Sequence, residues 1–175
     1  MKKIFSYVAV AFATIAIASC GNKAGNAAGE ADSTATTEQA AEAAAPSTFA
    51  ETDFFSVTGP DGWEVKADNS WDSNKSVRME DVNSTETFKP AIKVTVYKEK
   101  TIQEKVEYLT KGGDTYKKGD DLKLGDYTFT TVRGSNKLYN CFAQLEDGRL
   151  LEVETIYIEP EAEVVKPVVE SIKIK

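Results

Sequence analysis

The sequence predicts an α+β fold for residues 48–175, built from an antiparallel β-sheet flanked by helices. Two observations carry this prediction. Several segments alternate apolar and polar residues, which is the pattern of strands with one buried face. Among them lies one segment whose apolar residues recur with helical spacing, and turn residues separate the strands that follow it.

The first strands are short and end at clear turns. Phe54–Val57 predicts a strand that stops at Gly59–Gly62, where Pro and Gly set the backbone angles of a turn. Trp63–Lys66 and Val77–Glu80 alternate, so each should be half buried. Ile92–Tyr97 predicts a longer strand with one aliphatic face.

A helix is predicted directly after the longer strand. Thr101 and Glu104 have the spacing of a capping box, in which each side chain satisfies the other residue's backbone amide. Gly112-Gly113 should end the helix. One apolar stripe runs along it: Ile102, Val106 and Leu109.

The next hairpin allows two registers. A two-residue turn at Asp147-Gly148 would place Ala143 opposite Glu152, whereas a three-residue loop over 146–148 would place Ala143 opposite Leu151. Because matching apolar faces decide register, we predict the longer loop, with a positive φ at Gly148.

The rest of the domain is predicted as strands followed by a helix. The strands are 126–133 and 137–145, and the terminal helix is Pro160–Ser171. Pro160 fits a first helical turn, whereas Pro167 should kink or restart the helix because it lacks an amide donor.

The N-terminus predicts a secretory signal. Lys2 and Lys3 precede Ile4–Ser19, a run of sixteen uncharged residues that is short for a permanent membrane span. The alternative is a tilted transmembrane helix.

Cys20 ends this run in a recognisable context. Ile17-Ala18-Ser19-Cys20 resembles the lipobox of bacterial lipoproteins. The resemblance implies that residues 1–19 are a signal peptide cut off before Cys20, whose sulfur carries a diacylglyceryl group. Gly21 stands where an inner-membrane retention signal has Asp, so the resemblance favours the outer membrane.

The segment after Cys20 predicts a flexible tether over residues 20–47. Residues 21–47 contain ten Ala and no Leu, Ile, Val, Phe, Tyr or Trp. Such a segment buries too little apolar surface to offset the entropy of ordering it. As a coil it would span about 30 Å.

The order of elements in residues 48–175 resembles the PsbP-like α/β/α sandwich superfamily, which includes DcrB-type bacterial lipoproteins. The residues that carry the resemblance are Phe55–Val57 with Pro60–Trp63, Ile92–Val96 running into the Thr101 helix, and the closing Val168–Ile172. The resemblance implies a sandwich with helices on both sheet faces. It also implies a binding or assembly module rather than an enzyme.

Charge and composition exclude several classes of function. The formal charge is −7, which disfavours nucleic-acid binding because phosphate contacts need a concentrated basic surface. There is no histidine, so the commonest general base and transition-metal ligand is missing. No motif predicts a cofactor. A hydrolase is a further alternative, resting only on unassigned acids and serines.

One loop is a candidate binding site. Its oxygen-bearing residues alternate as at the start of a calcium loop, but Met79 stands where the closing Glu would be, so no metal is predicted. An exposed Trp71 there could anchor a partner or stack on a sugar. The candidate residues are Asp68, Ser70, Trp71, Asp72 and Asn74. Cys141, on an apolar strand face, is predicted to be a buried, inert thiol.

These observations predict a lipid-anchored, periplasm-facing lipoprotein that acts as a non-catalytic binding or envelope-assembly module. Its expected partners are the membrane, through Cys20, and an envelope protein. The alternative is a lipoprotein that binds calcium or a glycan through residues 68–74.

Overall fold

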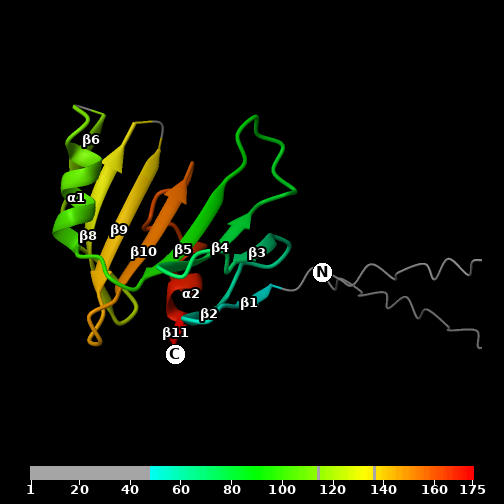
Figure 1. Cartoon of the computed structure of the whole chain (residues 1–175). Coiled ribbons are helices and arrows are strands. Elements are labelled where there is room, and N and C mark those ends of the chain that lie inside the picture. The colour runs from blue at the N-terminus through cyan, green and yellow to red at the C-terminus, as the bar shows by residue number, and fades with distance from the viewer. Residues whose placement is uncertain (1–47, 114, 136) are drawn as a thin grey trace, which may run out of the picture. The chain divides into compact units, whose positions relative to one another are not determined.

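The computed structural model describes residues 48–113, 115–135 and 137–175 (Figure 1). The predicted signal peptide, Cys20 and the tether lie outside these residues. All strand pairs of the described part are antiparallel. None of its helices is long and apolar enough to cross a membrane.

The strands form two sheets. The smaller sheet has the order β1-β2-β11, so it joins the start of the described chain to its end. Its strands are β1 (Phe49–Glu51), β2 (Phe55–Thr58) and β11 (Lys173–Ile174).

The larger sheet has eight strands in the order β3-β4-β5-β10-β9-β8-β6, with β7 also paired to β8. Its strands are β3 (Glu64–Asp68), β4 (Asn74–Glu80), β5 (Ala91–Tyr97), β6 (Tyr116–Lys118), β7 (Leu122–Leu124), β8 (Tyr127–Gly134), β9 (Leu138–Gln144) and β10 (Leu150–Ile156).

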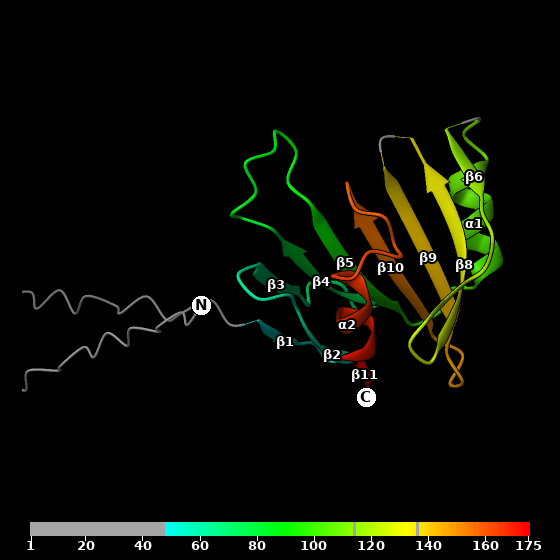
Figure 2. The same ribbon diagram turned by 180° about the vertical axis from the view of Figure 1, so that it is seen from behind.

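The main core lies between the two sheets. Alternate residues of β4, β5, β9 and β10 share one face and pack against the small sheet and the short helix α2 (Val165–Glu170). Figure 2 shows α2 lying against this face. Fully buried members from both sides include Val77, Val94, Phe129, Val153, Phe55, Val57 and Val169.

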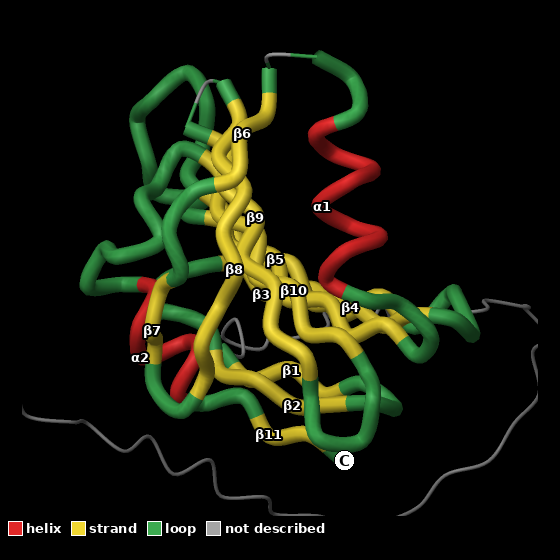
Figure 3. Tube along the Cα trace, turned by 90° about the vertical axis from the view of Figure 1, so that its left-hand side faces the viewer, coloured by secondary structure: helices red, strands yellow, loops and turns green. Residues whose placement is uncertain are grey.

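Helix α1 (Ile102–Thr110) covers part of the opposite face of the large sheet (Figure 3). Its apolar stripe packs against Val132, Phe142 and Leu150. The predicted capping box is confirmed: Glu104 N donates to Thr101 Oγ1 at 3.2 Å, and Thr101 N donates to Glu104 Oε2 at 3.0 Å.

The predicted hairpin register is also confirmed. Ala143 lies opposite Leu151 and Cys141 opposite Val153. Leu145 N donates to Arg149 O at 2.8 Å, which leaves residues 146–148 as the loop, and Gly148 has a φ of 85°.

The predicted α/β/α sandwich is wrong. The described part is mostly strand, with two helices, and a second antiparallel sheet covers the face on which the sandwich would have its second helical layer. The predicted helix Pro160–Ser171 begins only at Val165, because residues 160–164 form turns. The six residues of α2 are too few for a layer, so β1, β2 and β11 complete the cover.

Candidate functional site

The predicted binding residues 68–74 lie in and beside one hairpin loop. Asp68 ends β3 and Asn74 begins β4, with the loop between them exposed. The Asp68 carboxylate accepts a hydrogen bond from Ser70 N at 2.9 Å, and the bonds from Ser70 hold the pKa of Asp68 below its usual value. Asp68 therefore organises its own loop.

A buried lysine ties this loop to the segment between β1 and β2. Lys75 Nζ donates to Asn69 O at 2.7 Å and pairs with Asp53 Oδ2 at 3.3 Å, and its side chain is nearly buried. Trp71 is 65% exposed at the tip. In the described residues no group of three or more Cys, Asp or Glu side chains is arranged to hold a metal ion. The loop thus carries an exposed indole ring, and Lys75 holds the loop backbone in place.

A buried polar network joins α1 to the sheet, and no sequence pattern indicates it. Glu152 is 6% exposed. Its Oε2 lies 3.0 Å from Lys105 Nζ and accepts from Tyr97 OH at 2.6 Å, while Oε1 accepts from Asn140 Nδ2 at 3.3 Å. Burial and the Glu152 charge raise the pKa of the Tyr97 phenol well above its ordinary value.

The polar groups of this network are satisfied by one another and leave no buried group for a ligand to bond. No buried side-chain oxygen or nitrogen of the described residues lacks a hydrogen-bond partner. A satisfied network of this kind orders its elements. We therefore assign it to the seating of α1 on the sheet.

A groove opens where β8 and β9 separate. Their ladder ends at the pair Thr130–Phe142, although both strands continue, β8 down to Tyr127 and β9 up to Gln144. Meanwhile β8 stays paired to β7 through residues 127–129, and β9 stays paired to β10. Each strand is held on its outer side, so the gap between them persists.

The groove has a volume of about 640 Å³, within the range of ligand sites. Side chains of both strands, of the 146–148 loop and of β11 line it. They are Asp126, Tyr127, Thr128, Ala143, Gln144, Leu145, Glu146, Asp147 and Ile174. Four of them form an apolar surface, three are carboxylates and none is cationic.

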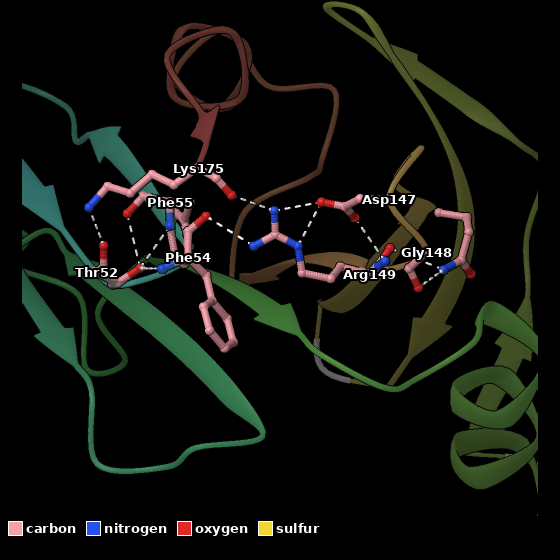
Figure 4. Close-up of polar contacts among 8 residues, drawn as sticks. Thr52, Phe54, Phe55, Asp147, Gly148, Arg149 and Lys175 are labelled. Carbon is pink, nitrogen blue, oxygen red and sulfur yellow. Dashed lines mark hydrogen bonds and ion pairs between the residues drawn. The ribbon is translucent and has the colours of Figure 1, made fainter.

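Arg149 fixes the frame beside the groove (Figure 4). Its Nη2 donates to Lys175 O and to Asp147 Oδ2, each at 2.6 Å, and its Nη1 donates to Phe54 O at 3.4 Å. This side chain thus ties the β9–β10 hairpin to the residue just before β2 and to the residue just after β11.

The charge of the groove is negative. Hydrogen bonds from Arg149 lower the pKa of Asp147, so this carboxylate is ionised and neutralised by its neighbour. Asp126 and Glu146 then carry the net charge of the rim. Burial, with a smaller contribution from Asp126, raises the pKa of Tyr127.

A smaller hollow lies at the other end of β9. Phe88 stacks on Tyr157, with ring centroids 5.1 Å apart and planes at 16°. With Glu86 and Lys137 they line a cavity of about 370 Å³. Lys137 and Tyr157 have positive φ values of 54° and 60°, which are uncommon for residues other than glycine.

The sequence held only part of the signal for the groove. Tyr127 and Ala143 lie on predicted strands, and the predicted register around the 146–148 loop is confirmed. The separation of β8 from β9 depends on the pairing of each with its outer neighbour, and no local pattern reports that. The role of Ile174 depends on β11, a two-residue strand too short to show alternation.

A scan against protein-family models and a search of curated proteins found no match to this chain.

Proposed function

We propose that this protein is a membrane-anchored lipoprotein whose β-rich domain faces the periplasm as a non-catalytic binding module. The anchor is the lipid on Cys20, and the tether gives the domain its reach. The groove between β8 and β9 is the binding surface. The observation that carries the binding role is this open groove on a frame held by Arg149.

The groove supports binding better than chemistry. Its polar lining consists of carboxylates, an amide, a threonine hydroxyl and a phenol. Cys141, the one thiol of the described residues, is 0% exposed, and burial raises its pKa to about 12, so its reactive thiolate is suppressed at neutral pH.

The anchor is tested by intact mass of the protein purified from membranes. The expected mass is that of residues 20–175 with lipid on Cys20. An unmodified chain that retains residues 1–19 would overturn the anchor. The Cys20→Ala variant is the control and should not be recovered in the membrane fraction.

The binding role is tested by chemical crosslinking in intact cells followed by mass spectrometry. The expected result is a crosslink to one recurrent envelope protein. This crosslink should be lost when Leu145→Arg fills the groove. Trp71→Ala is the matched control and should keep the crosslink. A partner lost with Trp71→Ala but kept with Leu145→Arg would contradict the groove as the binding surface.

A second candidate is glycan binding through Trp71. The observation that favours it is the exposed indole on a loop fixed by Lys75, since an aromatic face can stack on a sugar ring. Calorimetry with cell-wall glycan fragments should then give heat that Trp71→Ala abolishes. Absence of heat with the unmutated protein would count against this candidate.

A further inference from the structure

We infer that the groove binds an extended, basic peptide segment of a partner protein by adding it as a strand between β8 and β9. This inference rests on the proposed binding function and specifies its ligand. It follows from three features of the groove: its unpaired main chain, its apolar floor and its charge.

The main chain of both strands is open toward the groove. In an antiparallel ladder the amide and carbonyl of one residue point to the same neighbour, and successive residues alternate sides. Leu145 N donates to Arg149 O, just before β10, so Gln144 is directed to the β8 side. The same alternation directs Thr128 toward β9, because Thr131 O, three residues along β8, accepts from Gly119 N on the opposite side.

Thr128 and Gln144 would be the next hydrogen-bonded pair after Thr130 and Phe142, two residues further along each strand. The ladder ends before them, and both line the groove. An extended peptide can supply the missing donors and acceptors from its own main chain, as in other cases of strand addition.

Beside the open main chain lies an apolar floor. Tyr127, Ala143, Leu145 and Ile174 contribute it, and Ile174 comes from the edge strand of the small sheet. Side chains of an added strand alternate, so every second residue of the peptide would meet this floor. The floor therefore selects apolar residues at alternate positions.

The charge of the rim selects the remaining residues. Asp126 and Glu146 stand at the groove without a cationic side chain in its lining. Lys or Arg at the other positions of the peptide would complement them. The tether of the same chain does not fit, because residues 21–47 have one Lys against four acids and no branched apolar side chain.

The probe is a dye-labelled Lys-Val-Thr-Val-Lys peptide, added to the full-length protein purified from membranes in detergent. Fluorescence anisotropy measures its affinity, and hydrogen–deuterium exchange locates it. Binding should slow exchange in the segments around Thr128 and Gln144. A Glu-Val-Thr-Val-Glu peptide should bind more weakly.

Two controls separate strand addition from attraction by charge. A probe with N-methylated backbone amides keeps its charge but cannot complete a strand, and it should bind about tenfold more weakly. Asp126→Asn with Glu146→Gln should weaken the unmodified probe about fivefold. Asp61→Asn with Glu99→Gln removes the same charge at exposed positions elsewhere and should leave the affinity unchanged.

The inference is overturned if the probe does not bind, if the N-methylated probe binds equally well, or if both double variants weaken binding equally. Lipid attachment is read independently from the intact mass. A missing lipid would therefore overturn the proposed anchor alone, whereas a missing peptide complex would overturn the assigned ligand alone.

Discussion

Glu152 is the residue on which the seating of α1 depends. Glu152→Ala would leave Lys105 and Tyr97 facing a partly buried space without their carboxylate. Removing one partner of a buried pair costs about 3 kcal/mol of unfolding free energy. Urea denaturation measures this loss.

The control is the exposed Lys66–Glu64 pair, whose side chains are 71% and 45% exposed. Glu64→Ala should cost less than about 1 kcal/mol. Similar losses for the two variants would show that the Glu152 network contributes no more than a surface pair.

Glu154 gives the domain a specific dependence on pH. Burial and, second, the Glu152 charge raise its pKa above the ordinary 4.5, against the opposing charges of Lys93 and Arg78. The folded state therefore favours protonated Glu154, and it loses relative stability as the pH rises from the ordinary pKa through the raised one. Glu154→Gln should stabilise the protein at about pH 7 and make little difference at about pH 4.

Paired denaturation curves at the two pH values test this expectation, with Glu64→Gln as the exposed control on β3. A stabilisation of equal size at both pH values would assign the effect of Glu154→Gln to packing instead of ionisation.

At the scale of elements, the β9–β10 hairpin depends on one backbone angle. Gly148 has a φ of 85°, and an added Cβ would meet no atom within 4 Å. Gly148→Ala therefore isolates backbone strain, and it should cost about 1 kcal/mol. Gly112, just after α1, has equally open space without a positive φ, so Gly112→Ala should be neutral or slightly stabilising. Equal thermal midpoints for both variants would contradict the assignment of strain.

The elements that sequence predicted well are those whose signal is local. The α1 capping box lies within four residues, and the 146–148 loop was decided by apolar faces that lie a few residues apart. The small sheet is different, because Lys173 of β11 pairs with Ser56 of β2 across most of the domain. Its strands have two to four residues, which is too few for a period to appear.

At the scale of the whole molecule, the difference between local and long-range signals explains why a second helical layer is predicted where the structure has a small sheet. Three valines of the predicted helix Pro160–Ser171 are buried: Val165, Val168 and Val169. Their spacing did not reveal that residues 160–164 form turns and that β2 and β11 cover the rest of the core. The candidate loop at 68–74 could be placed from sequence, whereas the groove could not, since it arises from the pairing of four strands.

Arg149 decides whether the two sheets unfold as one body. It contacts Phe54 and Lys175 of the small-sheet side from the hairpin of the large sheet, and its side chain is only 16% exposed. Arg149→Met keeps an aliphatic stem but removes charge-assisted hydrogen bonds, which should cost about 2 kcal/mol. Hydrogen–deuterium exchange of the backbone amides should accelerate first in β11 and β2, because a weakened sheet opens locally before the core does.

The matched control is Arg78→Met, which removes a 45%-exposed guanidinium paired with Glu80 on β4. It should cost less than about 1 kcal/mol and leave exchange in β11 unchanged. Hydrogen–deuterium exchange distinguishes the two roles. Uniform acceleration through both sheets in Arg149→Met would mean that the sheets share one cooperative core without it, and that Arg149 adds stability but does not join them.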